Sequence, residues 1–183
     1  MADPLHPRVA EVARLLADSG HAGEVRVLPA EVRTAAAAAA ALKVPVGAIV
    51  NSLVFAVGEG NDVQPLLVLT SGAHRVDETT VAGLLGAPHL RRATPDFVRE
   101  ATGQAIGGVA PIGHPTPIGT LVDIELARYE RVWAAAGHPS AVFPTTYEEL
   151  LRLTAGTAAE VGSGPVEPGA VSVGTTTTQG AGA

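Results

Sequence analysis

The chain has 183 residues, a net charge of −6 at pH 7 and a single lysine, Lys43. Apolar residues make up 46% of it but aromatic residues only 3%, so one domain must build its core from Ala, Val and Leu side chains. The absence of cysteine excludes disulfides, thiol nucleophiles and cysteine zinc sites, and the acidic balance excludes a protein that coats duplex nucleic acid with a basic face.

Helical and strand patterns alternate along the first third of the chain. Apolar residues recur at helical spacing near the N-terminus: Leu5, Val9, Val12 and Leu16. They predict an amphipathic helix that ends near residue 18. A short strand is predicted over residues 25–28. The alanine run over residues 35–42 predicts a second helix, because alanine is the strongest helix former and Thr34 can cap its first turn.

Two apolar, β-branched runs predict a hairpin in the middle of the chain. They cover residues 47–57 and 65–70 and flank the turn residues 58–62. Next come a helix over 76–85 closed by Gly86, a strand over 89–92 and a helix that begins at Thr94-Pro95. Three strands are then predicted over 120–124, 132–136 and 141–143. The last element is a helix over 145–153, with a capping box formed by Thr145 and Glu148. This alternation predicts a mixed α/β or α+β domain over residues 1–160.

The two ends of the chain indicate where the folded domain ends and in which compartment the protein is expected. The last segment is rich in Gly, Thr and Ala, and we expect residues from about Val161 to 183 to form a disordered tail. The N-terminus lacks the basic start and apolar run of a signal peptide. No stretch approaches the roughly 20 apolar residues that a membrane helix needs, so we expect a soluble, cytoplasmic protein.

A glycine-rich segment over residues 107–114 is the most informative candidate site. Gly107 and Gly108 permit positive φ and close approach of a ligand, and Pro111 stiffens the segment. Successive backbone N–H groups in such a loop can hold a carbonyl or its developing oxyanion. The alternative is a tight connection between a helix and a strand, and spacing alone favours it.

Polar residues on two predicted strands are the second candidate. Asn51 and Ser52 interrupt an apolar strand, and adjacent strand residues point to opposite faces. One of them therefore points to the interior or to a pocket, where a substrate can pair with it, unless a bend or an edge brings water. Thr70 and Ser71 end the next strand, where loops often carry binding groups, although a solvated loop that leads into the next helix is by itself the favoured interpretation.

Other residue patterns narrow the chemistry. The only basic cluster, Arg91, Arg92 and Arg99, is the best candidate for a phosphate contact on an acidic chain. The sequence contains no Gly-x-Ser-x-Gly elbow, phosphate-binding loop or Gly-x-Gly-x-x-Gly fingerprint. Its six histidines form no His-x-x-x-His pair. We therefore expect neither a metal nor a cofactor.

Several segments, taken in order, carry a resemblance to a known family. They are residues 40–55 with Ile-Val-Asn-Ser-Leu-Val-Phe, 67–77 with Leu-Thr-Ser-Gly-Ala-His-Arg, 101–113 with Ala-Ile-Gly-Gly-Val-Ala-Pro-Ile-Gly, 121–123 with Leu-Val-Asp, and 135–137 with Ala-Ala-Gly. Together they resemble the YbaK/EbsC family, also called the prolyl-tRNA synthetase-associated domain. The resemblance implies a compact α/β fold with a mixed, partly barrel-like sheet. It also implies an aminoacyl-tRNA deacylase that hydrolyses the ester between a wrong amino acid and the terminal adenosine of tRNA, without metal or cofactor.

The resemblance also implies site residues and partners. The family's Gly-x-x-x-Pro loop, which holds the aminoacyl carbonyl, falls on Gly107, Gly108, Val109, Ala110 and Pro111. Further substrate contacts are expected at Asn51, Ser52, Thr70, Ser71, His114 and Asp123. The partner would be the acceptor end of a mischarged tRNA, with a synthetase as a second candidate.

One position departs from the family pattern. The family usually carries lysine where this chain has Asn51, and an amide donates hydrogen bonds without a charge. A catalytically silent module that binds aminoacyl or nucleotide ends, or a protein, is therefore the alternative. A hydrolase for a related small acyl ester or amide ranks third.

Overall fold

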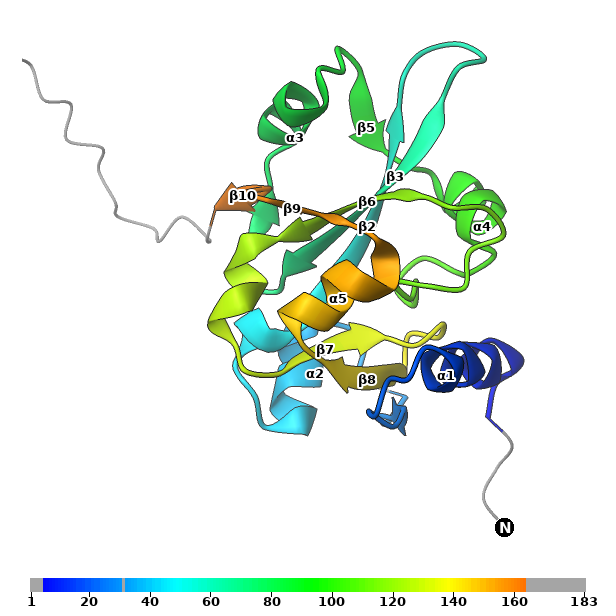
Figure 1. Ribbon diagram of the computed structural model, residues 1–183, viewed down its shortest axis with the longest axis vertical. Coiled ribbons are helices and arrows are strands. Elements are labelled where there is room, and N and C mark those ends of the chain that lie inside the picture. Colours follow the sequence, from blue (N-terminus) through cyan, green and yellow to red (C-terminus); the bar gives the residue numbers. More distant parts are fainter. Residues whose placement is uncertain (1–4, 31, 164–183) are drawn as a thin grey trace, which may run out of the picture.

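The computed structural model describes residues 5–30 and 32–163, and its elements follow the predicted order (Figure 1). The helices are α1 (Pro7–Asp18), α2 (Ala35–Leu42), α3 (Glu78–Leu85), α4 (Pro95–Thr102) and α5 (Tyr147–Thr154), with short 3₁₀ turns η1 (Val46–Ala48) and η2 (Ile124–Arg128). The strands are β1 (Arg26–Val27), β2 (Val50–Val57), β3 (Gln64–Ser71), β4 (Arg75–Val76), β5 (Leu90–Arg92), β6 (Gly119–Asp123), β7 (Val132–Ala135), β8 (Ala141–Thr145), β9 (Thr157–Ala159) and β10 (Gly162–Ser163).

The strands form one large mixed sheet, a smaller sheet and a two-stranded ribbon. The large sheet has the order β5-β2-β3-β6-β9. Its β5, β2 and β3 run antiparallel, which confirms the predicted hairpin, whereas β3, β6 and β9 run parallel. The small sheet has the antiparallel order β1-β8-β7, and β4 pairs with β10.

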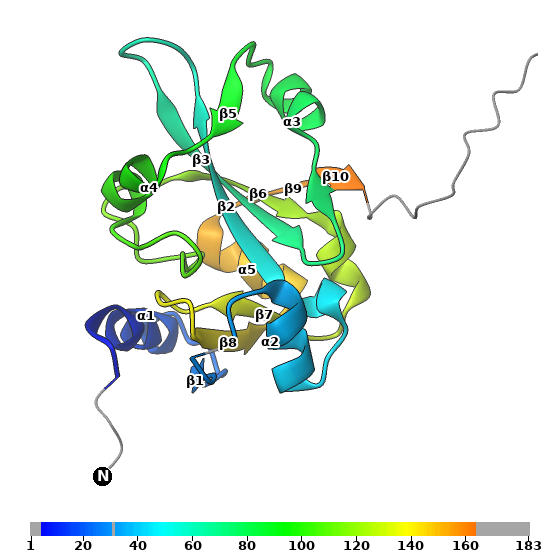
Figure 2. The same ribbon diagram turned by 180° about the vertical axis from the view of Figure 1, so that it is seen from behind.

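The two larger sheets meet at one corner and do not close into a barrel. Among the described residues, an isolated parallel bridge between Ile49 and Trp133 joins the start of β2 to β7. In Figures 1 and 2 the small sheet lies below the large one, with α5 in front in the first view and α2 in front in the second. The mixed α/β fold is confirmed, and the expected barrel-like character is limited to this junction.

Capping side chains fix the helix starts. Thr34 begins α2 as predicted, because its Oγ1 accepts the backbone N–H three residues on at 3.1 Å. The N-cap of the closing helix lies one residue later than predicted. Thr146, not Thr145, accepts the Glu149 N–H at 3.1 Å, while the Thr145 hydroxyl donates to the Glu149 carboxylate. The predicted Thr145–Glu148 capping box is therefore wrong.

The core consists mainly of small aliphatic side chains, as the composition predicts. The main cluster joins α1, β2, β3, β6, α5 and the small sheet through Val9, Val12, Leu16, Val50, Val54, Leu67, Leu69, Val122, Ala134, Phe143 and Leu150. A second cluster packs under α3 and contains Phe55, Leu66, Val68, Val81, Leu121, Ala159 and Val161.

The C-terminal segment belongs to the fold for longer than predicted. Val161 is 0% exposed, and its carbonyl accepts the N–H of Asp77, the N-cap of α3, at 2.9 Å. Gly162–Ser163 then pairs with β4. The predicted tail start at Val161 is therefore wrong, because one β-branched side chain in a Gly-rich stretch fills the second core cluster. The rest of the predicted tail, residues 164–183, lies outside the described residues.

We expect truncation to separate these two parts of the C-terminal segment. Burial of one valine contributes about 1.5–3 kcal/mol, so a chain ending at Glu160 should melt roughly 3–12 °C below one ending at Ser163. From composition, the chain ending at Ser163 should melt like the full chain. Thermal unfolding of the three chains tests this. Equal melting temperatures for the two truncated chains would show that the Val161 contacts add no stability.

Candidate functional site

A cavity of about 280 Å³ lies beside the start of β2. Its walls come from α2 and the loop before it, the first half of β2, the end of β5, the loop before Ala110, and the small sheet. The polar or glycine residues in this lining are Arg33, Thr34, Asn51, Ser52, Arg92 and Gly107, and apolar members include Ala38, Ile49, Val109, Trp133 and Val142. The fold thus brings Asn51 and Ser52 to the same cavity as part of the glycine-rich loop.

One edge of β2 is unpaired where it borders this cavity. Neighbouring β5 pairs with β2 only from Phe55 to Val57, and the Ala93 N–H donates to the Val54 carbonyl at 3.1 Å. Hydrogen bonds of an antiparallel strand alternate between its two edges, so Ser52 directs its N–H and C=O to the same edge as Val54. Within the described part of the chain, no backbone group pairs with Ser52 on that edge.

Two side chains in the cavity lining have unpaired polar atoms. The Ser52 hydroxyl and the Trp133 indole N–H are both buried and have no hydrogen-bond partner among the described residues. A buried unpaired polar group costs about 1–3 kcal/mol, which favours a ligand that pairs with it. The neighbouring Asn51 is half-buried and lines the same cavity.

Two residues of the glycine-rich loop line the cavity. Gly107 has φ of +87°, and Gly107 and Val109 line the cavity. Their N–H groups have no partner among the residues that the structure describes. The N–H groups of Gly108 and Ala110 are used inside the loop, at 3.1 Å to a backbone carbonyl and 2.7 Å to a glutamine side chain, and Pro111 has none. The loop can therefore offer backbone N–H donors at only two of the five predicted positions, Gly107 and Val109.

The loop keeps this shape through a buried glutamine and one close backbone approach. Gln104 accepts the Ala110 N–H at 2.7 Å and donates its Nε2 to the Ile112 carbonyl at 3.1 Å. A Cβ at Gly108 would lie 2.6 Å from the carbonyl carbon of His138, so only glycine fits there. Gln104 was not among the predicted site residues, and its only signal in the sequence is a polar residue between helix α4 and the glycines.

Three predicted substrate contacts lie away from the cavity, in a buried hydrogen-bond cluster. Asp123 is 0% exposed, and its Oδ2 accepts from the Thr70 hydroxyl at 3.0 Å and the Ser71 N–H at 3.1 Å. The His74 Nδ1 lies 3.0 Å from the same oxygen. The Ser71 hydroxyl donates to the Gly47 carbonyl at 2.7 Å. This cluster ties the end of β3 to the segment that leads into β2, so it supports the cavity wall.

The structure does not bring His114 to the cavity either. Its Nε2 lies 2.9 Å from the Ala110 carbonyl, on the side of the loop that faces α1. Burial lowers the pKa of His114, so the neutral ring donates this hydrogen bond. His114 therefore braces the back of the loop.

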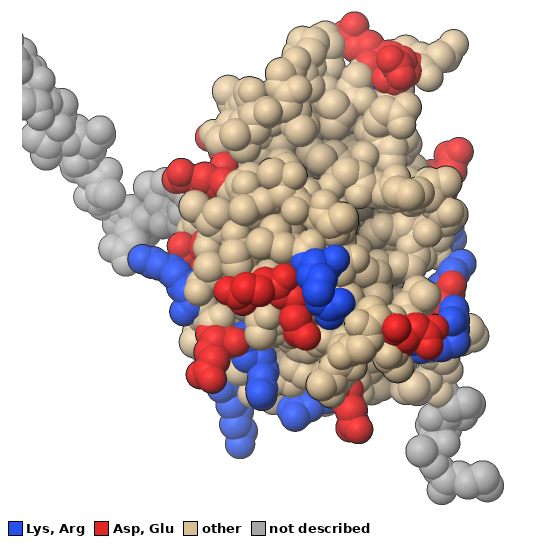
Figure 3. Space-filling model, in the orientation of Figure 1, with Lys and Arg blue, Asp and Glu red and all other residues tan. Residues whose placement is uncertain are grey.

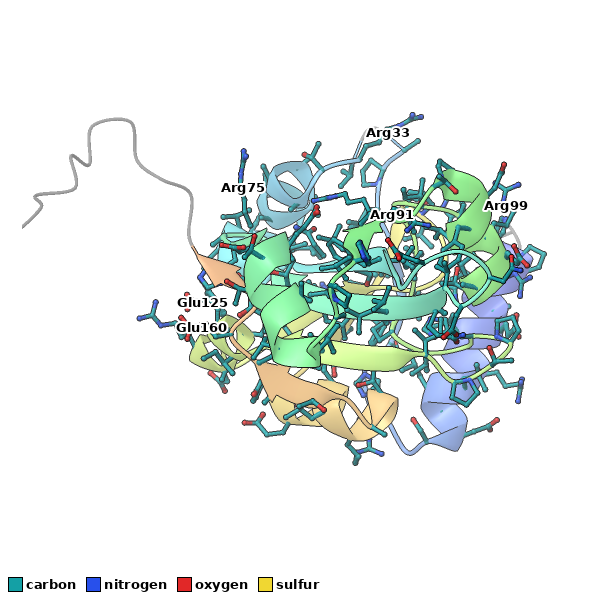
Figure 4. The ribbon with its side chains drawn as sticks, turned by 90° about the horizontal axis from the view of Figure 1, so that it is seen from above. Arg33, Arg75, Arg91, Arg99, Glu125 and Glu160 are labelled. Atoms are coloured by element: carbon teal, nitrogen blue, oxygen red, sulfur yellow. The ribbon has the colours of Figure 1, made fainter. Side chains whose placement is uncertain are left out.

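Two arginines line the cavity. Arg92 from the predicted basic cluster is one, and Arg33, which the sequence did not single out, is the other; Arg91 and Arg99 are not in the lining. Figure 4 shows Arg33, Arg91 and Arg99 on the side of the molecule away from the two labelled glutamates. The described lining contains no carboxylate. In contrast, the face drawn in Figure 3 has basic and acidic side chains next to one another.

Two further features concern metals and membranes. In residues 5–30 and 32–163, no group of three or more His, Asp or Glu side chains is placed to hold a metal ion. The His74 ring contacts Asp123 at 3.0 Å and Glu125 at 3.7 Å as part of the buried cluster. Each helix in the described part of the chain is too short or too polar to cross a membrane.

The sequence matches one protein family and several curated proteins. Residues 29–153 match the family described as the aminoacyl-tRNA editing domain. The chain is 32% identical over 113 residues to the uncharacterised protein YwhH of Bacillus subtilis, covering 62% of this chain and 69% of that one. It is also 38% identical over 90 residues to the proline–tRNA ligase of Solidesulfovibrio magneticus, covering 49% of this chain but only 15% of the ligase.

Solved structures share the fold over most of the chain. One is a protein proposed to be a trans-editing enzyme for prolyl-tRNA synthetase, with 44% identity and a TM-score of 0.81 over 88% of this chain and 100% of that one. Another is the hypothetical protein APE2540, with 28% identity and a TM-score of 0.74 over 85% of this chain and 99% of that one.

Proposed function

Because the chain belongs to the aminoacyl-tRNA editing domain family, we propose that it is a deacylase that hydrolyses the ester of mischarged tRNA. The observation that carries this proposal is one cavity that combines the unpaired N–H groups of Gly107 and Val109 with Asn51 and Ser52. Backbone N–H groups aimed at a developing oxyanion are a large source of rate enhancement in acyl transfer. A deacylase of this kind agrees with the cytoplasmic location expected from the sequence.

The reaction follows from the groups that line the cavity. The ester carbonyl oxygen would accept from the Gly107 and Val109 N–H groups, while Asn51 and Ser52 bond the ribose. Water adds to the carbonyl carbon, the bond to the ribose oxygen breaks, and a proton passes to that oxygen, giving free amino acid and uncharged tRNA. Ser52 itself has no histidine or carboxylate bonded to its hydroxyl, so water is the better nucleophile.

Deacylation of a panel of mischarged tRNAs tests this function. The first substrate to test is the proline tRNA carrying a wrong amino acid, because prolyl-tRNA ligases are among the relatives. We expect rapid release of at least one wrong amino acid and no release of proline. Binding of the charged tRNAs without release of any amino acid would support a silent binding module instead. Faster cleavage of simple acyl esters would support a small-ester hydrolase.

Asn51→Lys should tighten tRNA binding without loss of stability. Asn51 is half-buried at the cavity, so an added ammonium group can reach solvent and a bound phosphate. One added contact to single-stranded phosphate should steepen the slope of log K against log salt by about 0.7. Affinity at two salt concentrations and the melting temperature are the measurements.

A matched control separates a local contact from a change in net charge. Thr157→Lys adds the same charge at an exposed position of β9, the far edge strand of the large sheet. It should leave the slope nearly unchanged. A stable Asn51→Lys protein with unchanged affinity and slope would remove Asn51 from the site, whereas a large drop in melting temperature would place its side chain in the core.

A further inference from the structure

A second cavity of about 420 Å³ adjoins the first. Both are lined by Val32, Arg33, Ile106, Gly107 and Pro139. The second cavity adds Ala30, His138 and Ser140, and its described lining also lacks a carboxylate. Arg33 and Gly107 thus lie where the two cavities meet, at the same loop that offers backbone donors to an ester carbonyl.

We propose that the single-stranded 3′ end of the tRNA runs from the first cavity into the second, with Arg33 binding the phosphate between its last two nucleotides. The proposal rests on the proposed function, because it takes the first cavity as the aminoacyl site. It assigns the second cavity to the penultimate nucleotide.

The covalent structure of the substrate places this phosphate at the junction. The aminoacyl ester and the 5′ phosphate are attached to the same terminal ribose, so they lie only one sugar apart. If Gly107 binds the ester carbonyl, the phosphate lies within one sugar of a residue that lines both cavities. Arg33 also lines both cavities. A guanidinium group suits this role, because its planar donors match two phosphate oxygens.

Arg92 is the other cation of the first cavity, but its environment differs. Its Nε lies 4.0 Å from a Glu78 carboxylate oxygen, and its guanidinium carbon lies 5.8 Å from the Phe55 ring centroid. It also does not line the second cavity. Arg92 therefore serves as a matched control for charge at the first cavity alone.

The second cavity has the mixed surface that an unstacked nucleotide needs. Ile106 is 57% exposed and Pro139 is exposed, so apolar surface is open to a base. The Ser140 N–H donates to His138 Nδ1 at 3.2 Å, which puts the proton of the neutral imidazole on Nε2. That N–H can donate to a ligand oxygen, and no described residue bonds it.

Binding of two stable substrate analogues tests the proposal. The first is the amide of alanine with 3′-amino-3′-deoxyadenosine, which lacks a phosphate. The second is the same compound linked through its 5′ phosphate to cytidine. Fluorescence or calorimetric titration gives the affinity of both analogues for the wild-type protein, Arg33→Gln and Arg92→Gln, at two salt concentrations. Thermal unfolding of each variant checks the fold.

We expect Arg33→Gln to weaken the phosphate-bearing analogue about fivefold or more and to leave the phosphate-free analogue unchanged. The salt slope for the longer analogue should become shallower by about 0.7. Arg92→Gln should weaken the longer analogue less than Arg33→Gln does, because Arg92 lines the first cavity but not the second.

Each other outcome overturns the proposal in a distinguishable way. Equal effects of Arg33→Gln on both analogues would remove the phosphate contact. If Arg92→Gln weakened the longer analogue more than Arg33→Gln does, the result would indicate that the RNA runs towards β5 instead. These failures leave deacylation of the tRNA panel intact, whereas failure of the proposed function appears as no deacylation of any mischarged tRNA.

Discussion

Gly107→Val should lower deacylation by about 10²–10³-fold, the cost of one lost oxyanion donor in other enzymes. Gly107 has φ of +87°, a conformation that a β-branched side chain strongly disfavours. The nearest atom to an added Cβ, in Pro139, is 4.0 Å away, so the space itself tolerates a side chain. The loop should relieve the strain by rotating the Gly107 N–H away from the cavity. Single-turnover deacylation measures the loss.

Gly86→Val is the matched control for backbone strain. Gly86 ends α3 with φ of +60°, has no atom within 4 Å of the position that a Cβ would take, and does not line the cavity. Both variants should lose similar stability, but only Gly107→Val should lose activity. Gly108→Val is a poorer probe, because its side chain would clash with the His138 backbone and disturb the fold. Full activity in a folded Gly107→Val protein would remove this loop from the site.

Asp123→Ala should destabilise the protein by about 3–5 kcal/mol, because it leaves several buried donors unpaired at a cost of about 1–3 kcal/mol each. The carboxylate accepts the Thr70 hydroxyl and the Ser71 N–H on one oxygen and the Glu125 N–H on the other, at 3.0–3.1 Å. Alanine would leave these buried donors unpaired. For a domain of this size, the melting temperature should fall by roughly 6–20 °C.

Two controls separate support of the fold from contact with substrate. Asp18→Ala removes an exposed carboxylate paired with Arg14 and should change stability by about 0.5 kcal/mol or less. Asp123→Asn keeps the shape and two acceptor lone pairs, so it should lose less stability than alanine. If Asp123 contacted substrate, Asp123→Asn would instead alter kcat or KM at unchanged melting temperature.

Local signals were enough to predict most of the fold. The capped alanine run became α2, and the turn-flanked apolar runs became the β2–β3 hairpin, because capping and periodicity act over a few neighbouring residues. The short strands β4, β9 and β10 were missed. Each has two or three residues, and their strand geometry depends on distant partners, as Gly162 and Val76 show.

The candidate site was predicted in part. Asn51 and Ser52 were recognisable as polar residues within an apolar strand, and Gly107 as part of a glycine-rich segment. The structure places all three at one cavity. The roles of other residues depend on contacts that spacing does not encode. Gln104 decides which N–H groups of the loop remain unpaired, and Arg33 lies in a segment without a basic cluster.

The unpaired edge of β2 has a consequence for hydrogen exchange. The Ser52 amide lacks a strand partner, whereas the Leu53 amide faces β3, where Leu53 is opposite Val68. In the free protein, Ser52 should therefore exchange its amide proton with deuterium much faster than its neighbour. An acceptor atom of a bound substrate analogue at this edge would slow Ser52 and leave Leu53 unchanged. This contrast between adjacent amides would report occupancy of the cavity without any chemical turnover.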